Sequence, residues 1–225
     1  MPGLLIHADA LLRTGTPGLP ASDVTRRARL LLILVVVFGA AYGVAMGSYH
    51  SSGTNLRPLQ MLYSALKVPL LLLVTFGLSL PSYFVINSLL GLRQDLGAAL
   101  RALLATQACL TIILAALSPI TLFWYAGFSD YNQATLFNGL MFGVASVSGQ
   151  VLLRRLYRPL IARDSRHRAL LRLWLIIYCF VGIQLAWLLR PFIGQPDAPT
   201  HFFREDTWGN AYVIVAQRIW RLFNQ

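Results

Sequence analysis

The polar side chains that could do chemistry in this chain form two sets. The first set lies within long apolar stretches and consists of amides, namely Asn87, Gln107, Gln150 and Gln184. Amides inside a membrane-spanning bundle either hydrogen-bond between helices or line a polar path or ligand site. The same stretches contain no acid and no histidine. Hydrogen bonding between helices is therefore the favoured interpretation, and a polar path for a ligand is the alternative.

The second set consists of charged residues expected near one membrane face, namely Lys67, Asp130, Arg190 and Glu205. Long basic side chains at helix ends commonly reach toward the membrane interface, which is the favoured interpretation of this cluster. A sharper hypothesis is that Arg190 pairs with Asp130 or Glu205 and holds the C-terminal segment over the other helices. A lipid-processing site near Lys67 and Arg190 is a further alternative.

Patterns typical of catalytic or metal sites are missing from the sequence. It has no glycine-rich phosphate loop and no HExxH zinc motif, and no Ser, His and Asp residues show special spacing. The histidines and cysteines are scattered without metal-ligand spacing: His7, His50, His167, His201, Cys109 and Cys179. The sequence therefore predicts no catalytic residue, no metal and no cofactor, and the two cysteines are expected to be small buried residues.

The composition indicates a membrane protein. The chain is 56% hydrophobic and 12% charged, whereas soluble domains carry roughly 25% charged residues. We expect an all-α, polytopic transmembrane bundle forming one compact domain over residues 30–189. Pro81 should kink the second span. The expected spans are residues 30–49, 62–90, 98–125, 133–153 and 169–189.

The segments outside the bundle are expected to be amphipathic. Residues 1–29 should form a cytoplasmic segment with a short surface helix near residues 4–12, followed by an uncleaved signal anchor. Residues 190–225 should form an amphipathic tail on the outer side. From Trp208 onward, aromatic and aliphatic residues recur at helical spacing, which predicts a helix lying along the membrane interface.

The segment from Arg154 to Arg172 predicts the orientation. It carries seven arginines and a single acid, Asp164, and it is expected to be a loop between two spans. Because cytoplasmic loops retain Lys and Arg, this loop should lie inside. Thirteen of the nineteen basic residues then fall on the inner side. We expect a bacterial inner-membrane protein with its N-terminus in the cytoplasm and its C-terminus outside.

The net charge of +11 also bears on partners. Such a charge could indicate nucleic acid binding, but these residues sit in short segments between apolar spans, where they set topology and meet anionic lipid. We therefore expect contact with anionic lipid headgroups and no nucleic acid partner.

Two glycine ridges are expected to mediate helix packing. The first span carries Gly39, Gly43 and Gly47, and the fourth carries Gly139 and Gly143. Glycine at this spacing lets two helix backbones approach closely. The second ridge is a plausible partner for the first, and packing within one chain is favoured over a homodimer.

A cytoplasmic N-terminus, five closely spaced spans and short loops resemble the Yip family of small membrane proteins. The resemblance covers residues 30–189 at the level of topology, and the long outer tail departs from the family pattern. It implies a role in membrane organisation or vesicle traffic and assigns no functional residue. The leading hypothesis is a non-catalytic structural or organising subunit, associated with other membrane subunits or with itself. A passive channel or a small-molecule or lipid carrier is the alternative.

Overall fold

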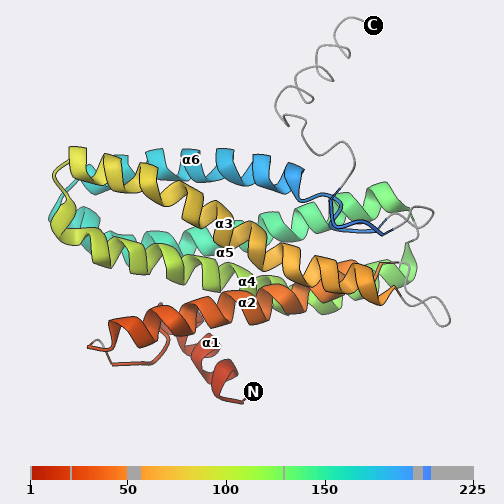
Figure 1. Cartoon of the computed structure of the whole chain (residues 1–225). Helices are drawn as coiled ribbons and strands as arrows, with labels where there is room; N and C mark the ends of the chain where they lie inside the picture. Colours follow the sequence, from red (N-terminus) through yellow and green to blue (C-terminus); the bar gives the residue numbers. More distant parts are fainter. Residues whose placement is uncertain (1, 21, 50–56, 129, 195–199, 204–225) are drawn as a thin grey trace, which may run out of the picture.

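A computed structural model describes residues 2–20, 22–49, 57–128, 130–194 and 200–203, and all regular structure in these residues is helical. Helices α2 to α6 are long and apolar enough to cross a membrane, which confirms the predicted all-α architecture. The helix expected from Trp208 onward lies outside the described residues. The elements are α1 (Pro2–Thr14), α2 (Val24–Gly47), α3 (Pro58–Leu89), the short 3-10 helix η1 (Arg93–Asp95), α4 (Leu96–Gly127), α5 (Tyr131–Arg163) and α6 (Arg166–Leu188) (Figure 1).

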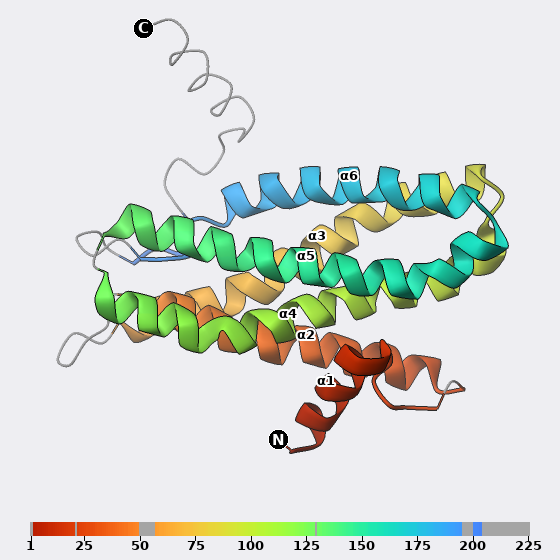
Figure 2. The ribbon, with the colours of Figure 1, turned by 180° about the vertical axis from the view of Figure 1, so that it is seen from behind.

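The five long helices run side by side along one axis (Figures 1 and 2). Helix α2 packs on both α3 and α4, α4 packs on α5, and α3 packs on α6. Few contacts join α5 to α6 or α3 to α4. The α3–α4 and α5–α6 connections lie at the same end of the bundle, which we call the basic end. The opposite end, where α2 ends and α3 begins, is called the far end.

Glycines bring α2 against α3. A Cβ atom built on Gly43 would lie 2.3 Å from the carbonyl oxygen of Ser64, and one on Gly47 would lie 2.7 Å from the Cα of Met61. Gly39 is less crowded, at 3.4 Å from Pro69 Cβ. Because backbone atoms cannot move aside as side chains can, only glycine fits at positions 43 and 47.

The other glycine pair does not face α2, so its predicted partnership with the first ridge is wrong. A Cβ atom on Gly139 or Gly143 would meet no described atom within 4 Å. The reason is the helix order, because α2 packs on α4 and α4 packs on α5. Gly139 and Gly143 instead lie on the exposed surface of α5.

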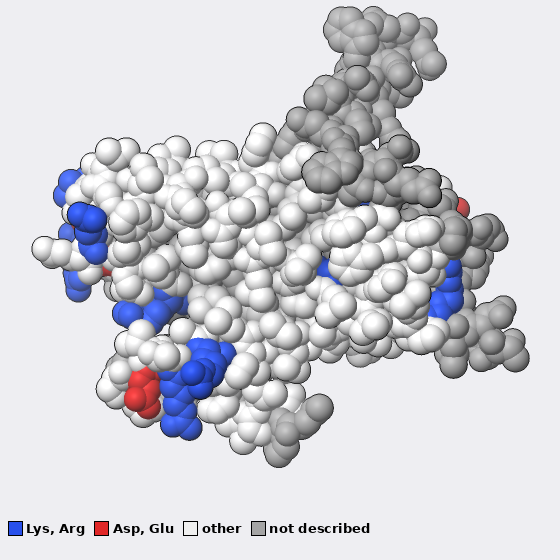
Figure 3. Space-filling model, viewed as in Figure 1, with Lys and Arg blue, Asp and Glu red and all other residues white. Residues whose placement is uncertain are grey.

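The segment expected to be a basic loop is also mostly helical. Helix α5 continues to Arg163 and α6 begins at Arg166, so only residues 164 and 165 separate them. Arginine and leucine favour helix, and this part of α5 buries Leu153, Tyr157 and Leu160. Lys and Arg side chains gather at the basic end of the space-filling view (Figure 3).

Helix α1 lies where the surface helix was expected and packs on the outside of the bundle (Figure 2). Ala8 and Leu11 are buried against α2 and α4, whereas Leu5 is 61% exposed. The guanidinium Nη1 of Arg155 donates a hydrogen bond of 3.1 Å to the carbonyl oxygen of Arg13. The N-terminal segment is therefore attached to α5 as well as to α2 and α4.

Candidate functional site

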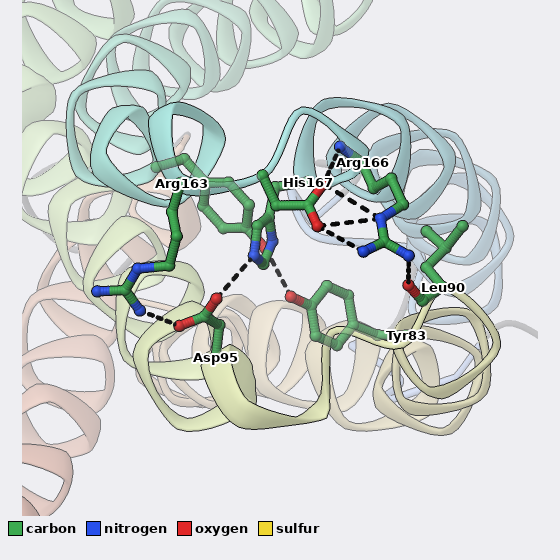
Figure 4. Close-up of polar contacts among 8 residues, drawn as sticks. Tyr83, Leu90, Asp95, Arg163, Arg166 and His167 are labelled. Atoms are coloured by element: carbon green, nitrogen blue, oxygen red, sulfur yellow. Dashed lines mark hydrogen bonds and ion pairs between the residues drawn. The ribbon is translucent and has the colours of Figure 1, made fainter.

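A polar junction lies at the basic end, where four elements meet (Figure 4). The Asp95 carboxylate contacts His167 Nε2 at 3.2 Å through Oδ2 and Arg163 Nη1 at 2.5 Å through Oδ1. His167 is fully buried and the Asp95 side chain is 13% exposed. One carboxylate thus connects the turn before α4 to the end of α5 and the start of α6.

Arg166 supplies a second connection at the junction (Figure 4). Its Nη1 donates to the carbonyl oxygen of Leu90 at 2.8 Å, and its Nη2 lies 2.7 Å from Asp164 Oδ2. The side-chain hydrogen bond from Arg166 lowers the pKa of the Asp164 carboxyl, with a smaller contribution from the Arg166 backbone N–H. The α3–α4 and α5–α6 connections are therefore joined at two points.

Aromatic side chains surround the buried imidazole. The hydroxyl oxygens of Tyr83 and Tyr157 are 2.5 Å apart and share a hydrogen bond between α3 and α5. The Tyr157 ring meets His167 nearly edge-on, with centroids 6.0 Å apart. The Tyr83 ring meets Trp174 in the same way at 6.1 Å. These four side chains are buried and form the core of the junction.

The intramembrane amides occupy different environments. Gln107 is buried and its Oε1 accepts a 2.7 Å hydrogen bond from the Tyr178 hydroxyl, which joins α4 to α6. Asn87 is fully buried and its amide lies near the Tyr83 hydroxyl, but neither amide atom makes a hydrogen bond of normal geometry in the described part of the chain. Gln150 and Gln184 are half-buried on α5 and α6.

A second polar site lies at the far end, where the chain leaving α6 returns to α3. Lys67 is fully buried, and its ammonium donates a 2.6 Å hydrogen bond to the carbonyl oxygen of Pro191. Ser64 Oγ donates to the carbonyl oxygen of Phe192 at 2.5 Å, and Gln60 Nε2 donates to the same oxygen at 3.0 Å. A cation is favoured here because the C-terminal end of a helix is partially negative.

Residues 200–203 also contact the start of α3. The Lys67 ammonium lies 4.9 Å from the centre of the Phe202 ring, and Tyr63 meets that ring edge-on at 5.2 Å. Arg57 Nη2 donates to Thr200 Oγ1 at 3.4 Å. We call Gln60, Ser64, Lys67 and the segments they bind the far-end clasp.

The charged residues expected around Lys67 are used in different ways. The Arg190 guanidinium stacks on the Trp187 ring at 3.2 Å from its centre. Asp130 caps the start of α5 by accepting the N–H of Gln133 at 2.7 Å. Glu205 lies outside the described residues. Lys67 thus hydrogen-bonds the backbone carbonyl of Pro191, the residue after Arg190, rather than a carboxylate.

A third polar contact, which the sequence analysis missed, is centred on Asn138. Its Oδ1 accepts the Tyr42 hydroxyl at 3.0 Å, and its Nδ2 donates to the Tyr125 hydroxyl at 2.6 Å and to the Ala134 carbonyl oxygen at 2.7 Å. These bonds join α2, α4 and α5. An amide within an apolar stretch is the signal that could have identified it, as it did for the glutamines.

The chemistry available to these groups is mainly hydrogen bonding. No group of three or more His, Cys, Asp or Glu side chains that could hold a metal occurs among the residues that the structure describes. Cys109 is buried, as expected, and Cys179 is exposed, contrary to expectation, because it lies on the outward face of α6. Comparison of the chain with protein families, curated proteins and solved structures finds no match.

Proposed function

We propose that the protein is a non-catalytic multi-pass membrane protein that serves as a structural or organising subunit. In this proposal, the exposed face of α5 receives a transmembrane helix of another subunit. The observation that carries it is the open space over Gly139 and Gly143. The corresponding ridge on α2 is already covered by α3, so one of the two glycine ridges remains available.

The arrangement of α5 and α6 supports this use. The far-end clasp and Arg166 hold the two ends of α6 close to α3, whereas α5 packs on α4. Because α5 and α6 share few contacts, much of α5 faces outward. Small residues on such a face allow close backbone approach, which drives helix association in a bilayer. The exposed apolar side chains that flank the glycines include Leu136, Leu140, Val144, Val147 and Val151.

The same contacts weaken the other two functions. A carrier path would be lined by amides of the apolar spans, but one of them, Gln107, is buried and bound to Tyr178. A lipid-processing site would need an accessible Lys67, but that side chain is fully buried and bound to Pro191. These two contacts therefore favour the subunit proposal over a carrier or a lipid-processing enzyme.

We further propose that the basic end faces the cytoplasm of a bacterial cell. The positive-inside tendency supports this orientation, since Arg154, Arg158, Arg168 and Arg172 are all exposed at this end. Anionic headgroups of the inner leaflet are their proposed partners. The topological resemblance to the Yip family is consistent with an organising role.

The test is purification of the full chain in mild detergent after crosslinking in the membrane, followed by mass measurement. We expect the wild type to carry a second polypeptide that Gly139→Leu with Gly143→Leu removes. Gly77→Leu is the matched control, because Gly77 is also exposed with open space but lies on α3. A monomer without a bound protein would contradict the proposal, and a mass of two chains would identify the partner as a second copy.

A further inference from the structure

Four polar or aromatic side chains follow one face of α3 at intervals of four residues: Thr75, Ser79, Tyr83 and Asn87. Each is at most 1% exposed. Helix α6 covers this face, since a Cβ atom on Gly182 would lie 3.4 Å from Thr75 Cγ2 and the Trp174 ring lies against Tyr83. We call these four residues, with Trp174 and His167 of α6, the polar seam.

Several polar atoms at the basic end of the seam lack partners in the described chain. They are both amide atoms of Asn87, Nδ1 of His167 and Nε1 of Trp174. All three side chains are at most 1% exposed. Buried polar groups without a partner cost free energy, and most such groups in folded proteins have one. Three such side chains around one junction therefore require an explanation.

The types of these atoms indicate what could bind them. Asn87 Nδ2 and Trp174 Nε1 can only donate, whereas Asn87 Oδ1 can only accept. These three atoms are neutral, and the fourth, His167 Nδ1, donates or accepts according to its tautomer, so the set does not favour an ion of either sign. A ligand must both donate and accept and must be small enough for a core of packed aromatic rings. Water meets these requirements, and buried water typically makes about three such hydrogen bonds.

We propose that the basic end of the polar seam is a binding site for ordered water, held by Asn87, His167 and Trp174. Asn87 lies one helical turn from Tyr83, and Tyr83 contacts both Trp174 and Tyr157. The ring of Tyr157 in turn lies against His167. The Tyr83–Tyr157 pair thus connects Trp174 to His167 through a series of direct contacts.

The site lies behind Asp95. The carboxylate of Asp95 is partly exposed and binds Nε2 of the buried His167 imidazole. Asp95 therefore lies between the protein surface and the imidazole. Water on the other ring nitrogen would complete the hydrogen bonding of His167. This inference is independent of the proposed function as a subunit, because it concerns the α3–α6 interface rather than the open face of α5.

X-ray hydroxyl-radical footprinting of the intact protein in detergent tests the proposal, because bound water is converted to radicals in place. We expect Tyr83 and Tyr157 to be modified severalfold more than Tyr42. Tyr42 is the matched control, since it is equally buried but hydrogen-bonds directly to Asn138. Equal modification of the three tyrosines would overturn the proposal.

Substitution of Asn87 gives an independent readout. If water satisfies the amide, Asn87→Leu should lower the melting temperature and reduce modification of Tyr83. If the site is dry, the same change removes an unpartnered buried amide and should raise the melting temperature. A higher melting temperature for Asn87→Leu would therefore refute the proposal. Asn138→Leu, which removes direct hydrogen bonds, should lower it in both cases. Should Asn87→Leu fail to fold, the wild-type footprint still decides.

Discussion

The Lys67 ammonium nitrogen lies 2.6 Å from the carbonyl oxygen of Pro191, although the lysine is fully buried. A buried charge is costly unless hydrogen bonds and opposite partial charges compensate for it. The carbonyls that follow α6 and the face of the Phe202 ring provide that compensation. Lys67 therefore determines where the chain runs after it leaves α6.

Replacing Lys67 with Met should release that chain segment. The change keeps the apolar stem but leaves the Pro191 carbonyl without its donor, at a cost of about 1–3 kcal/mol. We expect faster cleavage by a nonspecific protease in the segment that begins at Pro191 and a lower melting temperature in detergent. Leu66→Met is the control, because Leu66 is 52% exposed. Unchanged cleavage in Lys67→Met would show that the clasp does not hold the segment.

Replacing a glycine with alanine should have different effects on stability in the two glycine ridges. Gly43→Ala places a Cβ atom 2.3 Å from a backbone oxygen of α3, and overpacking of this kind costs about 1–3 kcal/mol. In the chain purified without a partner, Gly143→Ala meets open space and should be neutral or stabilising by roughly 0.5–1 kcal/mol, since alanine favours helix. Thermal unfolding of both variants in the same detergent gives the comparison. Equal melting temperatures would disprove the close α2–α3 contact.

The junction should depend on Asp95. In Asp95→Ala, the buried His167 loses its acceptor, at a cost of about 1–3 kcal/mol. Asp9→Ala is the control, because the Asp9–Arg13 pair has side chains 60% and 76% exposed and surface pairs contribute about 0.2–1 kcal/mol. Hydrogen exchange at residues 90–95 should increase in Asp95→Ala alone. Equal exchange in the two variants would show that Asp95 does not hold the connection.

The Asp164–Arg166 pair predicts a loss of stability in acid. The pKa of Asp164 is lowered in the folded protein, so folding favours the ionised carboxylate. This contribution is complete above the unfolded pKa of about 3.9 and disappears as the pH falls through the folded pKa. The melting-temperature difference between wild type and Asp164→Asn should therefore be largest near neutrality and shrink below about pH 4. A constant difference across this range would contradict the assignment.

The proposed orientation predicts which positions an impermeant thiol reagent can reach. In a background of Cys109→Ala and Cys179→Ala, Glu205→Cys should be labelled from outside intact cells and Ser165→Cys should not. Permeabilised cells provide the control, because both positions should then react. The reverse pattern would place the basic end outside.

The apolar pattern predicted the existence and order of the helices well but placed some ends incorrectly. Hydrophobicity alone stops the fourth span near residue 153, because the following residues are rich in arginine. The helix continues to Arg163 since arginine is compatible with helix and Tyr157 and Leu160 are buried on its inner face. Charge therefore marked the expected membrane boundary and not the end of the helix.

Contacts between distant residues were less predictable. His167 and Asp95 are 72 residues apart and lie at two separate connections, so no local spacing could pair them. The glycines of α2 and α5 look alike in sequence, yet α3 covers one set and the other remains open. Which helix lies beside which depends on packing of the whole bundle. Amides within apolar stretches predicted contacts between helices better than the glycines did, because Gln107 forms the expected hydrogen bond between two helices.

The attachment of α1 has a consequence for biosynthesis. Gly15, which directly follows α1, lies against Leu156 of α5, and the Arg155 side chain that binds the Arg13 carbonyl is 142 residues further along the chain. Helix α1 therefore cannot reach its final position until the chain has been synthesised and inserted as far as α5. Docking of α1 is a late step of assembly, which follows completion of the helices on which it rests.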